Sequence, residues 1–161
     1  MVISISMISY ANICGLGFTY DSFDYYAASK SWSSNYNLIN QNGTFYNFHA
    51  PLYPILISLF TGNNQVLLIV MNGVIGLTTL ILLYISIRKL FENEFLFILT
   101  YMSIVLNVGF LMIHHFLWTE PIFLLLFVLH NYLLCRFLAT FKTRDFLGLI
   151  FVAFVSVSYT H

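Results

Sequence analysis

Charged side chains are scarce in this chain of 161 residues, in which Asp, Glu, Lys and Arg together make up 7%. An average soluble domain carries about 25% charged residues, so this composition excludes an ordinary water-soluble domain. Acidic and basic residues number six each, and the formal net charge is +0. A chain without a positive field does not attract the phosphates of DNA or RNA, which excludes a nucleic-acid-binding function.

Cysteine and proline are also rare. The two cysteines, Cys14 and Cys135, form neither a disulfide framework nor the spacing of a zinc site. We interpret both as small buried hydrophobic residues. Of the three prolines, Pro51 and Pro54 frame a single short apolar segment.

Apolar surface is what the chain has in abundance. Hydrophobic residues make up 60% and aromatic residues 19%, and the mean hydropathy is +0.85. An isolated strand cannot satisfy its backbone hydrogen bonds in lipid, whereas a helix can. We therefore predict an all-α integral membrane protein that forms a single membrane domain over residues 1–161.

Long apolar stretches predict about five membrane helices, of which the last is cut off by the end of the sequence. They are residues 1–18, 66–87, 95–113, 116–135 and 146–160. Residues 51–62 also read as a helix, with Pro in the first turn and Gly at the end. A helix of that length reaches about 18 Å, short of the roughly 30 Å hydrocarbon core, so we expect it in the interface.

The basic residues predict the orientation. Five of the six fall in two short loops separated by two predicted spans: Arg88, Lys89, Arg136, Lys142 and Arg144. The positive-inside rule places both loops in the cytoplasm. The N-terminus then also faces the cytoplasm, and residues 19–65 form a large extracytoplasmic loop with short interfacial helices. We expect the cell membrane as the location.

The loop is the one long polar interval of the chain, and Lys30 is its only strong cation. The predicted topology also brings the starts and ends of later spans to the same surface. One membrane face therefore collects carboxylates and imidazoles: Asp21, Asp24, Glu120, His49, His114 and His115.

Four short motifs resemble a known family. They are DSFDY at 21–25, AA at 27–28, HAPLYP at 49–54 and TEPIF at 119–123. Their order and spacing are similar to those of the membrane glycosyltransferases of the C superfamily. The resemblance is strongest to the branch with the protein O-mannosyltransferases and the lipid A aminoarabinose transferase.

The resemblance implies an enzyme that moves a mannose-like or related sugar from a polyprenyl-phosphate carrier to an acceptor outside the cytoplasm, with inversion. The acceptor would be a protein, a lipid or a glycan. The family's catalytic base maps onto Asp21, and a carboxylate within hydrogen-bond reach can remove the proton of an attacking hydroxyl. The carrier phosphate is a good leaving group whose charge cations or hydrogen-bond donors can stabilise.

The other site residues are hypotheses built on this mapping. Glu120 would be a second catalytic acid, and Lys30 with His49 would contact the carrier phosphate. The further candidates for substrate binding are Asp24, Tyr53, His114 and His115.

Structural interpretations of the same residues stay open. Asp21 or Asp24 could cap the helix of the loop, and Glu120 could interact with the dipole of the helix it begins. Adjacent residues on a helix point about 100° apart, so His114 and His115 cannot easily share one metal. Both could be interfacial histidines, and Lys30 could lie on a solvated helix face.

A divalent metal is a further alternative, because some members of the family bind one near this site. His49 could hold it together with Glu120 or Asp21 if the loop folds back. No ligand spacing in the chain demonstrates such a site.

Two other classes of function compete with the enzyme. Members of the family usually have more membrane helices, so the chain would be an N-terminal fragment. It could then be a non-catalytic membrane subunit that packs against a full-length partner. A small ion-binding or transport protein is the third possibility, although such a protein is expected to carry acids deep within its spans.

Overall fold

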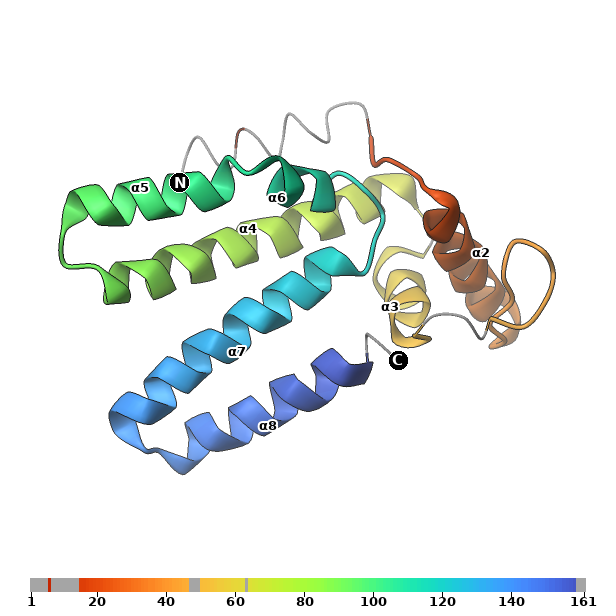
Figure 1. The fold of residues 1–161 in the computed structure, drawn as a ribbon. Coiled ribbons are helices and arrows are strands. Elements are labelled where there is room, and N and C mark those ends of the chain that lie inside the picture. The colour runs from red at the N-terminus through yellow and green to blue at the C-terminus, as the bar shows by residue number, and fades with distance from the viewer. Residues whose placement is uncertain (1–5, 7–14, 47–49, 63, 159–161) are drawn as a thin grey trace.

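The computed structural model describes residues 6, 15–46, 50–62 and 64–158, and in these residues the chain is all-helical with no β-strand (Figure 1). The predicted all-α class is thus confirmed. The helices are α2 (Tyr20–Asn35), α3 (Leu52–Thr61), α4 (Gln65–Leu90), α5 (Glu94–Val105), α6 (Val108–Ile113), α7 (Glu120–Thr140) and α8 (Thr143–Ser158). The helix predicted at 1–18 lies almost entirely outside the described residues.

Helices α4 and α7 lie side by side and begin at the same end of the molecule (Figure 1). Helix α5 folds back along α4, and α8 folds back along α7. Helices α2 and α3 contact each other and lie at the end where α4 and α7 begin. This arrangement places the polar loop and the first turn of α7 together.

Two helices, α4 with 26 residues and α7 with 21, are long and apolar enough to cross a membrane. They measure about 39 Å and about 31 Å at 1.5 Å per residue, against a hydrocarbon core of about 30 Å. Only 28% and 11% of their apolar windows are buried inside the protein. The core helix of a soluble protein is mostly buried, so these exposed apolar surfaces indicate association with a membrane.

Asparagine side chains fix three helix starts. The Oδ1 atoms of Asn64 and Asn93 accept hydrogen bonds from backbone N–H groups of the first turns of α4 and α5. Asn107 does the same for α6, accepting from the N–H of Gly109 at 2.8 Å. The prediction of one continuous helix at 95–113 is therefore wrong, because Leu106 and Asn107 interrupt it between α5 and α6.

The apolar side chains of the described residues gather in two clusters. The first joins α2, α3, the start of α4 and the start of α7, with Tyr25, Ala28, Tyr53, Ile57 and Ile122 among its buried members. The second lies between α4, α5 and α6. The first cluster carries the end of the molecule at which the candidate site lies.

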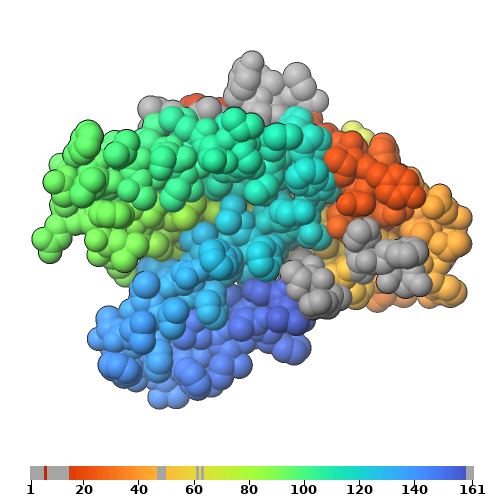
Figure 2. Space-filling model, viewed as in Figure 1, coloured from red at the N-terminus to blue at the C-terminus, as the bar shows by residue number. Residues whose placement is uncertain are grey.

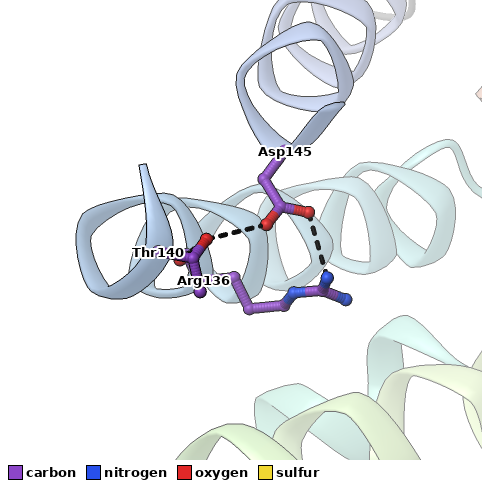
Figure 3. A network of polar contacts seen from close by, with 3 residues as sticks. All are labelled: Arg136, Thr140 and Asp145. Atoms are coloured by element: carbon purple, nitrogen blue, oxygen red, sulfur yellow. Dashed lines mark hydrogen bonds and ion pairs between the residues drawn. The ribbon is translucent and has the colours of Figure 1, made fainter. Parts of the chain in front are cut away.

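The opposite end of α7 is tied to α8 by a polar contact (Figure 3). The Asp145 carboxylate is buried and lies 3.1 Å from the guanidinium of Arg136, and Thr140 Oγ1 donates to it at 3.2 Å. Cys135, on the same stretch of α7, is exposed. The interpretation of this cysteine as a buried hydrophobic residue is wrong, while Cys14 lies outside the described residues.

Candidate functional site

Two segments that are far apart in the sequence meet just before α2 and α7. The N–H of Gly17 donates to the carbonyl of His115 at 2.8 Å, and the N–H of Leu117 donates to the carbonyl of Gly17 at 3.1 Å. A side chain at position 17 would meet the Phe116 ring at 2.5 Å, so the approach requires glycine. In Figure 2 the teal atoms before α7 adjoin the orange-red atoms at the start of α2. This pairing also explains why α7 begins at Glu120 and not at 116.

Thr19 is the N-cap of α2. Its N–H donates to Ser22 Oγ at 3.0 Å, which forms one half of a capping box. Its Oγ1 accepts a hydrogen bond of 2.8 Å from the indole Nε1 of Trp118. The alternatives that Asp21 or Asp24 caps this helix are therefore wrong.

Tyr25 marks the point where the predicted carboxylates converge. Its side chain is 5% exposed and hydrogen-bonds to the side chain of Thr119. Burial raises the pKa of Tyr25, the bond to Thr119 opposes that shift, and the negative charges of Asp21, Glu120 and Asp24 add to it. The charges of both helix starts therefore reach the Tyr25 side chain, which lies between them in the same apolar cluster as Ile122 of α7. Asp21 and Glu120, both exposed, lie in the first turns of neighbouring helices.

Three tyrosines pack together in the first apolar cluster, next to these helix starts. The ring of Tyr53 meets the ring of Tyr25 edge-on at 5.1 Å, and the ring of Tyr46 lies 6.4 Å from it. Burial, together with the neighbouring tyrosine and carboxylates, raises the pKa of Tyr46 far above its ordinary value. The phenols of Tyr25 and Tyr46 are therefore neutral at physiological pH and cannot act as bases. Tyr53, predicted to bind substrate, is 2% exposed and lies in the core beneath the site.

Asp24 has a structural contact. Its carboxylate is 7% exposed and accepts a hydrogen bond of 3.2 Å from the N–H of Gln41. Asn40 Oδ1 in turn accepts from the N–H groups of Asn42 and Thr44. Asp24 thus attaches the turn after α2 to the helix. Its buried carboxylate lies next to the site but not on the site's exposed surface.

The fold does not place the side chain of Lys30 next to that of Asp21. Nine residues separate them on one straight helix, which is about 13 Å along the axis. The ammonium of Lys30 is exposed and lies 4.5 Å from the centre of the Tyr26 ring. His49, the other predicted phosphate contact, lies outside the described residues.

The two adjacent histidines have different environments. His114 is fully buried, with Nδ1 2.8 Å from the carbonyl of Phe110. Its own carbonyl accepts a 2.6 Å hydrogen bond from Asn72 Nδ2 of α4. Burial lowers the pKa of His114, and the contact with the Phe110 carbonyl opposes this shift. His115 is half-buried, and its ring lies 5.0 Å from that of Phe116.

Among the described residues, no group of three or more His, Cys, Asp or Glu side chains could hold a metal ion. Asp21 and Glu120 act on the same hydroxyl from two helices, and the described chain adds no third ligand to them. The possible divalent metal of the sequence analysis therefore stays an alternative that involves His49, beyond the described residues.

An apolar groove lies beside the site. Its volume is about 410 Å³, and α3, α4 and α7 line it with Leu56, Met71, Val74, Ile75 and Ile122, among others. Ile122 is two residues from Glu120 in the first turn of α7. The groove therefore reaches the helix turn that carries Glu120.

The site combines two exposed carboxylates, two helix starts and an apolar groove. A carboxylate can accept a proton from a hydroxyl, and the partial positive charge of helix N-termini favours an anion nearby. The contacts made by Thr19, Trp118 and Tyr25 were not predicted from the sequence. Thr19 with Ser22 three residues later resembles a capping-box spacing, but nothing local identified Trp118 as its partner.

No known protein family, no curated protein and no solved structure matches this chain.

Proposed function

We propose that the protein is a membrane glycosyltransferase that moves a sugar from a polyprenyl-phosphate carrier to an acceptor hydroxyl. One observation carries the proposal: the 2.8 Å hydrogen bond from Trp118 to Thr19 joins the starts of α2 and α7. These two helix starts carry Asp21 and Glu120, the two acids of the resemblance, although 99 residues separate them. The paired segments before α2 and α7 hold them there. The motifs at 21–25 and 119–123 support the same class of enzyme.

The mechanism assigns Asp21 the role of general base. Its carboxylate takes the proton of the acceptor hydroxyl as the oxygen forms a bond to the anomeric carbon. The bond between that carbon and the carrier phosphate breaks, and the phosphate leaves with the electron pair, so the anomeric centre inverts. Glu120 would orient the sugar or the acceptor through its hydroxyl groups. The partial positive charges at the N-termini of α2 and α7 stabilise the negative charge on the leaving phosphate.

The apolar groove supports a donor that carries a lipid. Its lining contains aliphatic side chains of α3, α4 and α7, and one of them, Ile122, lies in the same helix turn as Glu120. The polyprenyl chain would lie in it, which places the phosphate at the helix starts. Asp24, Lys30, His49, Tyr53, His114 and His115 were the predicted substrate contacts. In the proposed function Asp24, Tyr53 and His114 support the site from within, because they are buried.

We also propose that the protein crosses the membrane several times, with further passes beside the two long helices. Residues 1–18, the interrupted pair α5 and α6, and α8 would complete five passes with α4 and α7. The end with α2 and α3 would face the outside of the cell membrane, and the end with Arg88, Lys89 and Arg136 would face the cytoplasm. Acceptor and donor would then meet on the extracytoplasmic side.

The test is sugar transfer by an Asp21→Asn variant in native membranes. Loss of a general base should lower the transfer rate about 10²- to 10⁴-fold without loss of membrane insertion. Glu94→Gln is the matched control, because it removes an exposed acid from the first turn of α5 at the other end of the molecule. Transfer that survives Asp21→Asn would contradict the assignment and favour the non-catalytic subunit.

A further inference from the structure

A second groove lies at the opposite end of the molecule from the carboxylates. It has a volume of about 820 Å³ and lies between the C-terminal halves of α4 and α7. Leu83, Phe127 and Val128 form part of its apolar wall, and Lys89 and Arg136 lie at its polar end. Neither the proposed transfer reaction nor its donor uses these residues.

The two cations of the groove converge on one aromatic ring. The ammonium of Lys89 lies 4.6 Å from the centre of the Tyr132 ring, and the guanidinium of Arg136 lies 5.9 Å from it. Asp145 neutralises part of this charge through its 3.1 Å contact with Arg136 (Figure 3). Two cations and one carboxylate leave a net positive charge at the end of an apolar groove.

Charge and shape together define the occupant. A cation pair over a ring favours an anionic phosphate, which arginine and lysine bind by charge-assisted hydrogen bonds. The apolar wall from Leu83 to the level of Lys89 follows six residues of α4, or about 9 Å. A soluble anion would not use that wall, and a lipid without net charge would not use the cations.

We propose that this groove binds an anionic phospholipid of the surrounding membrane. Lys89 and Arg136 contact its phosphate, and one acyl chain lies against Leu83, Phe127 and Val128. The exposed apolar surfaces of α4 and α7 keep the groove open to the bilayer, so the lipid enters sideways. The site is independent of the proposed transferase activity, since it uses the other end of both helices.

The test measures lipid binding to the purified protein by native mass spectrometry. Phosphatidylglycerol should bind at least 5-fold more tightly than phosphatidylcholine with the same acyl chains. Lys89→Gln should weaken phosphatidylglycerol binding roughly 5-fold, which corresponds to about 1 kcal/mol for one basic residue near an anionic lipid. Arg88→Gln is the matched control and should change binding less than 2-fold, because Arg88 lies over Phe97 and does not line the groove.

A second pair of variants tests the apolar wall without changing charge. Ala139→Phe fills the groove and should weaken lipid binding, whereas Ala153→Phe on the exposed face of α8 should not. Equal losses for Lys89→Gln and Arg88→Gln would overturn the proposal, since they would indicate diffuse surface attraction. Equal binding of the two lipids, or competition by glycerol phosphate alone as strong as that by the lipid, would overturn it too.

Discussion

Thr19 and Trp118 form the side-chain contact on which the candidate site depends most directly. The indole Nε1 of Trp118 donates to Thr19 Oγ1 at 2.8 Å across 99 positions of sequence. Asp21 follows Thr19 by two residues, and Glu120 follows Trp118 by two. A displacement of either segment would therefore separate the two carboxylates, although neither Thr19 nor Trp118 takes part in the chemistry.

Replacing Trp118 by Phe keeps an aromatic ring but removes the donor. We expect a loss of about 1 kcal/mol in the free energy of unfolding, the usual net value of one hydrogen bond. We also expect sugar transfer to fall more than stability explains, because the orientation of Asp21 relative to Glu120 changes. Thermal unfolding in detergent and transfer assays on the same preparation measure the two effects.

The control for this variant is Trp32→Phe, because Trp32 lies on α2 and its ring contacts Tyr36 of the same segment. It should leave transfer unchanged. Equal effects of the two substitutions on transfer would show that the Trp118 hydrogen bond does not position the acids.

At the scale of elements, a buried charged contact joins α7 and α8. Asp145 is 3% exposed, whereas the side chain of Arg136 is 33% exposed. Helix α7 ends in a left-handed residue, Phe141 with φ of 49°, and α8 begins two residues later. The short connection fixes the hairpin, and the Asp145 carboxylate joins the first turn of α8 to the last turns of α7.

Asp145→Asn tests the contribution of this charge. Asparagine can still accept the bond from Thr140 but no longer attracts Arg136. We expect a loss of about 2 kcal/mol in the free energy of unfolding, the typical value of a hydrogen bond to a charged group. Thermal unfolding in detergent measures the change.

Arg144→Gln removes an exposed charge from the neighbouring position and is the control. It should change stability by less than about 0.5 kcal/mol, as surface substitutions usually do. A similar loss in both variants would mean that net charge, and not the contact with Arg136, stabilises the hairpin.

At the scale of the whole molecule, one group of acidic side chains and one pair of basic side chains lie at opposite ends. Asp21, Asp24 and Glu120 gather where α4 and α7 begin. Lys89 and Arg136 gather over Tyr132 toward the end where both helices finish. If α4 and α7 cross the membrane, these ends face different compartments.

Cysteine labelling measures this directly. In a background with Cys14→Ser and Cys135→Ser, a membrane-impermeant maleimide should react with Ser34→Cys in intact cells. It should react with Lys142→Cys only after permeabilisation, because positions 34 and 142 are exposed at opposite ends. Reaction of both variants in intact cells would contradict the proposed orientation.

The sequence alone determined the fold class and most of the helices. The apolar runs at 66–87 and 116–135 became α4 and α7, and Pro and Gly correctly framed α3. Apolar periodicity and length are local properties of a chain, so they can be read without knowing its neighbours. The interruption at Asn107 was missed because an apolar run conceals a polar residue that caps a new helix.

Only the tertiary structure decided which of the predicted site residues meet. The first turns of α2 and α7, which carry Asp21 and Glu120, are joined by the bond between Trp118 and Thr19, whereas Lys30 lies further along α2 and His114 is enclosed in the core. These outcomes depend on the pairing of Gly17 with the segment before α7 and on the bond between Trp118 and Thr19. Contacts between residues about 100 positions apart leave no periodic signal in the sequence, because each partner is specified by the packing of whole helices.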